Sequence, residues 1–377
     1  MAERKKLYMG IDIGSVSLNI AIIDERVNLL ESVYQRTKGQ PIPALLDVFN
    51  NLIKDFPYID GVIATGSGRD LVAETLGVEK ENEILTQGRA VTYFHPEVRT
   101  VIEIGGQDSK LIFLEPDERK GGSVIVDHAL NEICAAGTGS FLDQQAYRLG
   151  ISIDREFGEL ALKAQKPATI AGRCSVFAKS DMVHLQQEGT PKEDIVAGLC
   201  YALARNYISN LGKGKKFKKP VAFQGGVAAN KGVSRAFEDL LELEKGELII
   251  PEHFFVTGAL GSAIVARERE TCTPLELKQA IEDMQTYLNR TSNESKHGYL
   301  KKLRYRDGAT ADAGDEDIQQ GRKKVYLGID VGAASTNIVI LDENKNLLRK
   351  RYLMTEGEPI ESVKKGLADI STGMEDL

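Results

Sequence analysis

A strand–glycine turn–strand unit that occurs twice constrains the fold of this chain more than any other feature. Residues 6–13 (KLYMGIDI) and 18–24 (LNIAIID) are apolar and rich in β-branched side chains, and a short turn that begins at Gly14 joins them. This pattern predicts a β-hairpin. Residues 101–114 repeat it, with the strands VIEI and KLIFL on either side of the turn GGQD. The fold must therefore accommodate two such hairpins.

Carboxylates lie beside both glycine turns. Asp12 precedes the first turn, whereas Glu103 precedes the second and Asp108 ends it. Glycine turns can expose backbone N–H groups that bind phosphate. A carboxylate beside a phosphate requires a divalent cation between them, usually Mg²⁺ held through water. For the first turn alone, a plain hairpin with an Asx turn is the simpler explanation. Two hairpins that face each other are more specific, and they predict a polyphosphate clamp.

Two cysteines precede predicted helices. Cys134 lies just before a Gly-Thr-Gly, where Thr138 or Ser140 can cap a helix, and Cys174 is followed by Ser175, the predicted N-cap of another. A thiol at a helix N-terminus has a lowered pKa and is a good nucleophile or metal ligand. The two cysteines are 40 positions apart, and zinc or a [4Fe–4S] cluster normally takes four ligands. A closed site therefore needs two chains; otherwise these are ordinary thiols.

Composition excludes several classes of protein. The net charge of −7 gives no globally basic surface for nucleic acid, and four cysteines in 377 residues do not suggest a disulfide scaffold. No apolar run reaches the length of about 18 residues that a membrane-spanning helix needs. The first residues also lack the apolar core of a signal peptide. We therefore expect a cytoplasmic protein with neither a nucleic-acid nor a membrane partner.

A third glycine turn follows a short strand at 221–223. Its residues Gly225 and Gly226 lead through Asn230 into a helix, and such a turn can hold a nucleoside at the helix N-terminus. Gly258 opens a helix of small residues, TGALGSA, which permits close packing. Capping boxes at Thr190 and Thr273 predict two further helix starts.

The N-terminal pattern begins again near the end of the chain. Residues 325–348 (VYLGIDVGAASTNIVILDENKNLL) match residues 7–30 at an offset of 318, so that Asp330 corresponds to Asp12. Residues 291–324 are charged, contain glycines and have few apolar side chains, which is typical of a linker. We expect three parts: one whole module at 1–270, a helix plus charged linker at 271–324, and the start of a second, truncated copy at 325–377. A fragment of a longer protein explains this better than a nonfunctional stub.

Seven motifs in one order identify a resemblance to a known family. GIDIGSVSLN, ATGSGRDLV, IEIGGQDSK, CAAGTGSFLD, CSVFAKSDMV, FQGGVAANKGV and TGALGSA resemble the ATPase activators of 2-hydroxyacyl-CoA dehydratases and the ATPase subunits of benzoyl-CoA reductase. The resemblance covers about residues 7–267. It implies an α/β fold of the actin/Hsp70/sugar-kinase (ribonuclease H-like) type, with two subdomains around a cleft for ATP and Mg²⁺. It also implies a homodimer bridged by one [4Fe–4S] cluster, with two cysteine ligands from each subunit.

The resemblance also assigns site residues. Cys134 and Cys174 would hold the cluster. The hydrolytic residues would be Asp12, Glu103, Gln107 and Asp108. The nucleotide would contact Gly14, Ser15, Val16, Gly105 and Gly106 at the phosphates, Gly225, Gly226 and Asn230 at the adenosine, and Gly258. Two positions depart from the family pattern: Glu103 stands where Asp is usual, and Asn19 stands where many members have Lys.

The function implied is that of an ATP-driven one-electron donor. It would accept a low-potential electron from ferredoxin or flavodoxin and pass it to a dehydratase- or reductase-like acceptor protein. ATP would close the cleft and move the helices that begin after the two cysteines. The partner across the cluster would be a second subunit or, in a longer chain, the second module. A small-molecule kinase of the same fold and a nucleotide-sensing module without significant turnover remain alternatives.

Overall fold

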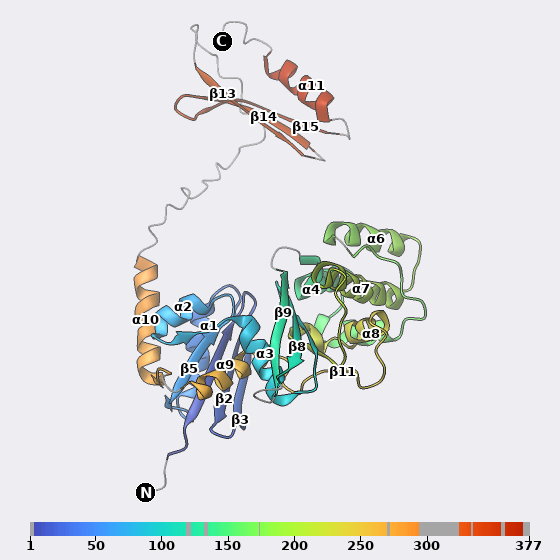
Figure 1. Ribbon diagram of the computed structural model, residues 1–377. Helices are drawn as coiled ribbons and strands as arrows, with labels where there is room; N and C mark the ends of the chain where they lie inside the picture. Colours follow the sequence, from blue (N-terminus) through green and yellow to red (C-terminus); the bar gives the residue numbers. More distant parts are fainter. Residues whose placement is uncertain are drawn as a thin grey trace. The chain divides into compact units, whose positions relative to one another are not determined.

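The computed structural model describes residues 4–117, 122–131, 135–172, 174–269, 272–293, 324–332, 335–355 and 359–371. The chain divides into two units, Met1–Glu294 and Ser295–Leu377, and each is described by itself (Figure 1). Cys134 and most of the predicted linker lie outside the described residues. Within the described part of the chain, no helix has the length and apolar character needed to cross a membrane.

The first sheet of unit 1 contains the N-terminal hairpin. Its strands are β1 (Leu7–Ile13), β2 (Ser17–Asp24), β3 (Leu29–Arg36), β5 (Gly61–Thr65) and β6 (Glu79–Lys80), in the order β3-β2-β1-β5-β6. β1 pairs antiparallel with β2, which places Asp12 opposite Asn19, and parallel with β5. The hairpin predicted for residues 6–24 is therefore confirmed.

Helices cover both faces of this sheet. On one face, apolar side chains of β1 and β2 form a core with α1 (Pro41–Leu52) and α10 (Leu277–Asn293), and α10 also packs against α2 (Arg69–Leu76). On the other face lies α9 (Thr257–Glu268), whose small residues allow it to touch the strand backbone. A Cβ atom on Gly10 would lie 1.8 Å from the carbonyl oxygen of Ala259. The close packing predicted for TGALGSA is thus present.

The second sheet repeats the plan of the first. Its strands are β7 (Thr100–Ile104), β8 (Ser109–Pro116), β9 (Ser123–Asn131), β10 (Val221–Gln224) and β11 (Leu248–Ile249), in the order β11-β10-β7-β8-β9. The β7–β8 hairpin places Glu103 opposite Lys110, as the β1–β2 hairpin places Asp12 opposite Asn19. The second predicted hairpin is also confirmed.

Helices also pack on both faces of the second sheet. One face packs against α3 (Glu83–Phe94). The other face shares a core with α4 (Gly139–Leu149), α6 (Ser175–Gln187), α7 (Lys192–Tyr207) and α8 (Lys231–Leu240). Between α4 and α6 lie a π-helical turn at Ile153–Phe157 and α5 (Gly158–Leu162). This layer carries Cys174 at the start of α6 and Cys200 within α7.

Three predicted helix starts are wrong in detail. Cys174, not Ser175, is the N-cap of α6, because Cys174 is extended (φ −145°, ψ 130°). Pro191 is the N-cap of α7, because the N–H of Thr190 donates to the carbonyl of Leu185 and so closes the preceding helix. No helix begins at Thr273, because the following Leu275–Glu276 forms a short strand, β12, against β4 (Tyr58–Ile59).

Unit 2 is a small sheet with one described helix. β13 (Val325–Val331), β14 (Ser335–Asp342) and β15 (Leu347–Met354) pair antiparallel in that order, and α11 (Pro359–Ser371) packs on β14 and β15. Asp330 lies opposite Asn337, the register of Asp12 and Asn19 in unit 1. The repeated sequence therefore folds into the same three-stranded antiparallel arrangement.

Candidate functional site

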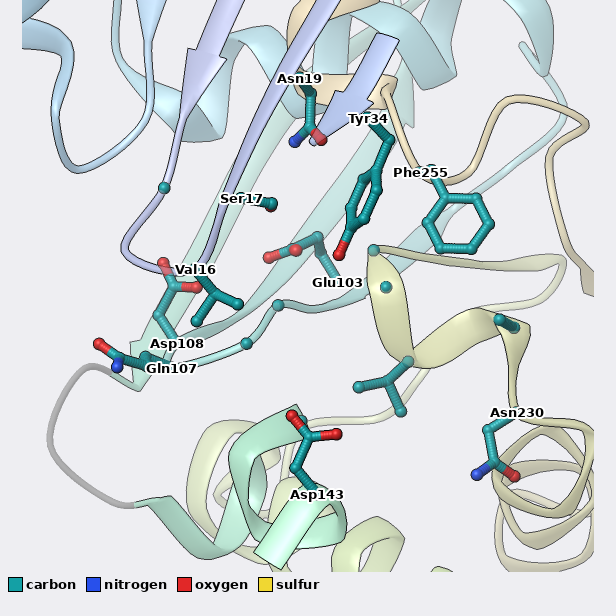
Figure 2. Close-up of a pocket in the computed structure, with 18 of the residues that line it drawn as sticks. Val16, Ser17, Asn19, Tyr34, Glu103, Gln107, Asp108, Asp143, Asn230 and Phe255 are labelled. Carbon is teal, nitrogen blue, oxygen red and sulfur yellow. The ribbon is translucent and has the colours of Figure 1, made fainter. Parts of the chain in front are cut away.

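A cleft of about 730 Å³ lies between the two sheets of unit 1, a volume in the range of small-ligand sites. Figure 2 shows that its lining comes from both hairpins, from α4 and from the turn before α8. Twelve of the fifteen residues that the sequence predicts for a site line it. These residues are Asp12, Gly14, Ser15, Val16, Glu103, Gly105, Gly106, Gln107, Asp108, Gly225, Gly226 and Asn230.

The two glycine turns face and touch each other. In each turn the N–H of the first glycine donates to a carbonyl three residues on, from Gly14 to Ser17 at 2.8 Å and from Gly105 to Asp108 at 3.1 Å. A Cβ atom on Gly106 would lie 2.6 Å from a methyl carbon of Val16. The turns are therefore packed as closely as glycine allows. This is the facing arrangement that a polyphosphate clamp requires.

A buried lysine that the sequence analysis did not single out stands at the centre of the acidic groups. The Nζ atom of Lys110 lies 2.7 Å from Asp108, 3.0 Å from Glu103 and 3.0 Å from Glu83, and its side chain is only 4% exposed. Burial alone would lower the pKa of this lysine, but the three carboxylates outweigh that effect and raise it well above its ordinary value. Lys110 therefore stays charged at neutral pH.

Two carboxyl groups of the cleft have raised pKa values. Burial, with the nearby charges of Glu83 and Asp108 adding to it, raises the pKa of Asp12 to about 7. Burial likewise raises the pKa of Glu103 to about 8, although Lys110 acts in the opposite direction. Three carboxyl groups thus surround the Lys110 ammonium, and Asp12 interacts with it electrostatically. This cluster of carboxyl groups fits an additional cation.

Of the residues the structure describes, no three His, Cys, Asp or Glu side chains converge as a metal site. The carboxylates around Lys110 are hard oxygen donors, which suit Mg²⁺ better than a soft metal. They fit a Mg²⁺ ion that is held largely by water and phosphate, as such ions usually are.

The opposite wall has the features of a nucleoside site. The Oδ1 atom of Asn230 accepts hydrogen bonds from the N–H groups of Gly232 (3.0 Å) and Val233 (3.3 Å) and so caps α8. Its Nδ2 atom is buried without a hydrogen-bond partner in the described part of the chain. Gly225 has φ +86° and passes so close to β7 that a Cβ atom would lie 2.5 Å from the carbonyl oxygen of Ile104. An unpaired buried donor beside a glycine turn suits a polar ligand.

Gly258 is not among the residues that line the cleft. A Cβ atom at this position would lie 2.2 Å from the Oδ2 atom of Asp12, so Gly258 makes room for that carboxylate from behind. Several lining residues were missed by the sequence analysis. They are Glu83 from the first turn of α3, Asp143 on α4, and the aromatic pair Tyr34 and Phe255, whose ring centres are 5.3 Å apart.

Sequence signals existed for only some of the missed residues. Lys110 could have been found, because hairpin register puts it opposite Glu103. Glu83 and Phe255 reach the cleft from segments distant in sequence, and no local pattern indicates them.

The N-terminus of α4 is bonded directly to the second glycine turn. The N–H groups of Gly139 and Ser140 donate to the carbonyls of Gly105 (2.9 Å) and Gly106 (2.8 Å), and the Ser140 hydroxyl also donates to Gly106 at 2.6 Å. Ser140 therefore does not cap the helix. Thr138 occupies the N-cap position without a side-chain capping bond. The Gly-Thr-Gly after Cys134 is thus joined to the second glycine turn.

The described cysteines have different environments. Cys174 is half-buried at the N-cap of α6, which has no side-chain capping bond. Cys200 is fully buried inside α7, and this burial raises its pKa to about 12, as expected for a core thiol. Cys272 is half-buried against the first sheet. The predicted pairing of Cys174 with Cys134 involves a residue outside the described part of the chain.

Two α/β sheets, each presenting a glycine-turn hairpin with a carboxylate to a shared cleft, define a nucleotide-binding protein of the actin/Hsp70/sugar-kinase fold. The predicted fold class is confirmed. More particularly, the chain belongs to the BadF/BadG/BcrA/BcrD ATPase family, whose pattern matches residues 9–266. The predicted family is therefore also confirmed.

Characterised relatives and solved structures resemble this chain over most of unit 1. A 2-hydroxyisocaproyl-CoA dehydratase activator from Clostridioides difficile is 31% identical over 274 residues, which are 72% of this chain and 98% of the relative. The crystal structure of component A of (R)-2-hydroxyglutaryl-CoA dehydratase from Acidaminococcus fermentans has a TM-score of 0.62 at 31% identity, covering 70% of this chain and 98% of that one. An activator of 2-hydroxyisocaproyl-CoA dehydratase from Clostridium difficile with bound ADPNP has a TM-score of 0.60 at 30% identity, covering 74% and 97%.

Proposed function

We propose that this protein is an ATP-dependent activator that uses ATP binding and hydrolysis to pass one low-potential electron to a dehydratase- or reductase-like partner protein. The observation that carries the proposal is the cleft with two facing glycine turns in the same unit as a thiol at a helix start. The names of the relatives, which are activators of 2-hydroxyacyl-CoA dehydratases, support it. A ferredoxin or flavodoxin would supply the electron.

The hairpin residues would bind and hydrolyse the nucleotide. The glycine turns would bind the phosphates through backbone N–H groups, and Asn230 would donate its unpaired Nδ2 hydrogen to the adenosine. Asp12 and Glu103 have pKa values of about 7 and 8, near the range in which a carboxylate can accept a proton from water at neutral pH. Lys110 would hold Glu103 and Asp108 in place. A bound Mg²⁺ would neutralise the phosphate charge beside the four carboxyl groups.

Cys134 and Cys174 would hold a [4Fe–4S] cluster that two subunits share and that supplies one-electron chemistry when bound. Cys174 fits this role because it lies half-buried at the N-terminus of α6, a helix without a side-chain capping bond. The first turn of α6 exposes Val176 and Phe177, each 65% accessible. Exposed apolar side chains next to a thiol support a surface that another chain covers. The homodimer would supply the other two ligands.

We further propose that residues 1–270 form the ATPase module, that 271–324 form a helix and linker, and that 325–377 begin a second copy. The proposed function is tested by anaerobic purification, iron and sulfide counts, and visible spectra before and after dithionite. We expect half a [4Fe–4S] cluster per module and its loss in Cys134→Ala. Iron-free wild-type protein, or full partner activation by Cys134→Ala, would refute the proposal. Phosphorylation of a hydroxylated substrate by cluster-free protein would instead identify a kinase.

A further inference from the structure

Helix α7 contacts both strand β8, whose Lys110 lines the cleft, and the segments that flank Cys134 and Cys174. Figure 1 shows it beside α4 and α6, and it packs against both of them and against the short turn Ala135–Gly137 that follows Cys134. Its last two residues, Asn206 and Tyr207, are both buried. They make side-chain bonds to different parts of unit 1, and these bonds have no role in the chemistry proposed above.

Tyr207 ties α7 to the strand that carries the buried lysine. Its hydroxyl donates to the carbonyl of Lys110 at 2.6 Å, and its ring packs edge-on against Phe237 with centroids 5.5 Å apart. The side chain of the same Lys110 holds Glu103 and Asp108 at the cleft. A shift of β8 on nucleotide binding would therefore reach α7 through one buried hydrogen bond.

Asn206 ties α7 to both cysteine segments. Its Nδ2 atom donates to the carbonyl of Gly172 at 2.5 Å, two residues before Cys174. A Cβ atom on Gly137, three residues after Cys134, would lie 2.8 Å from its Oδ1 atom. One amide group thus lies against both segments.

Further contacts fix the segment before Cys174 on α7. A Cβ atom on Gly172 would lie 2.6 Å from the carbonyl oxygen of Ala202, so this glycine rests on the helix backbone. The guanidinium of Arg205 also donates to the carbonyl of Ile170 at 3.0 Å. The segment has little freedom to move unless α7 moves with it.

We propose that Asn206 and Tyr207 are positioning residues that couple the nucleotide cleft to the two cysteine segments. The hydrogen bond of Tyr207 makes the position of α7 depend on that of β8. The contacts of Asn206 make the positions of Gly172 and Gly137 depend on that of α7. This inference rests on the proposed function, since it assigns these residues a part in linking nucleotide state to the cysteines. Spatial connection alone does not establish coupling, so the test measures the coupling itself.

The experiment measures alkylation rates of individual cysteines in the full chain. The protein is first reduced and treated with chelator. It is then labelled with iodoacetamide, with and without Mg²⁺ and the non-hydrolysable analogue ADPNP, and peptide mass spectrometry measures the labelling of each cysteine. Cys272, which packs against the first sheet, is the reference whose rate should not change. Cys200 is buried and is the control that should not react. We expect the analogue to change the rates at Cys134 and Cys174 by about fivefold, the change that one hydrogen bond of ordinary strength supports.

Two variants separate coupling from folding. Tyr207→Phe keeps the aromatic ring and removes only the hydroxyl, so it should bind ADPNP within about twofold of wild type but lose the rate change. Asn206→Asp keeps the shape but removes the donor to Gly172, so both cysteines should react faster without nucleotide and no longer respond to it. The matched control is Tyr201→Phe, on the same helix, whose hydroxyl bonds to Asp239 instead.

The outcomes distinguish this inference from the proposed function. A full response in Tyr207→Phe, or a wild-type protein that binds ADPNP without any change at the cysteines, would overturn the coupling role. Wild-type protein that binds no nucleotide would overturn the proposed function. Loss of the response in Tyr207→Phe but not in Tyr201→Phe would establish the role of the Tyr207 hydroxyl.

Discussion

Replacing Lys110 by methionine should destabilise unit 1 strongly and in a pH-dependent way. The variant keeps an unbranched side chain of similar length but leaves Glu83, Glu103 and Asp108 without the ammonium that lies within 3.0 Å of each. Removing one partner from a buried ion pair costs about 3–5 kcal/mol, because the remaining charge is left uncompensated. We expect a loss of this size at pH 8.5.

The loss should be smaller at lower pH. Lys110 lowers the pKa of Glu103, which is nevertheless raised to about 8 by burial, so the variant should raise that pKa further. At pH 6 Glu103 is then protonated, which relieves the repulsion, whereas a larger fraction of it is ionised at pH 8.5. Lys110 itself is charged at both values in the folded protein and, with an ordinary pKa of about 10.4, in the unfolded chain. The pH dependence therefore belongs to Glu103.

The assay is urea unfolding followed by hydrogen–deuterium exchange of peptides from β7 and β8, which observes unit 1 separately from unit 2. The control is Lys218→Met, which breaks an exposed ion pair with Glu115 and should leave the midpoint unchanged. A double variant, Lys110→Met with Glu103→Gln, should recover part of the loss because it also removes a negative charge. Equal effects of Lys110→Met and Lys218→Met, or an equal loss at both pH values, would contradict this role of Lys110.

Three further predictions concern ligand binding, pH and packing. Asn230→Asp keeps the cap of α8 but replaces the unpaired Nδ2 donor, so calorimetry should show about tenfold weaker ADPNP binding with little loss of stability. Asn230→Ala should also cost about 1 kcal/mol of folding stability, and equal stability losses in the two variants would contradict this prediction. Because the folded-state pKa values of Asp12 and Glu103 are raised to about 7 and 8, their contribution to the free energy of unfolding falls as pH rises from about 5 to 8. Glu103→Gln should make the free energy of unfolding from urea titrations depend less on pH, and an unchanged pH dependence would exclude Glu103 as its source. Gly10→Ala should prevent unit 1 from folding as measured by circular dichroism, since its Cβ would lie 1.8 Å from a backbone oxygen, whereas Gly328→Ala, which meets only a methyl group of Val339 at 3.0 Å, should leave unit 2 folded.

The sequence predicted the parts of the site that are local. Both hairpins follow from alternating apolar runs and glycine turns, and their register places Asp12 and Glu103 without reference to the rest of the chain. The small residues that begin α9 likewise predicted close packing. Helix caps were less predictable, because the backbone conformations of Cys174 and Pro191 make these residues the N-caps in place of the expected Ser175 and Thr190.

What the sequence could not predict depends on contacts between distant segments. Glu83 reaches Lys110 from the start of α3. In the sequence Glu83 has the pattern of an ordinary acidic residue in the first turn of a helix. Gly258 stays a predicted nucleotide contact, and the structure adds a role that the sequence does not indicate, since its missing Cβ atom leaves room for the Asp12 carboxylate. Such roles arise only when the two sheets are brought together around the cleft.

The chain contains two copies of the N-terminal hairpin, and comparing them separates what the local sequence determines from what tertiary packing determines. β1–β2 and β13–β14 share the same register, so the local sequence suffices to form the hairpin. Ile11 is fully buried in unit 1, whereas its counterpart Ile329 is 44% exposed in unit 2. Burial is also the main reason that the pKa of Asp12 is raised. In unit 1 this burial comes from β5, α9 and the second sheet, which surround the hairpin. The motif therefore predicts a turn that is able to bind phosphate, and the surrounding layers supply the buried, acidic cleft on which hydrolysis would depend.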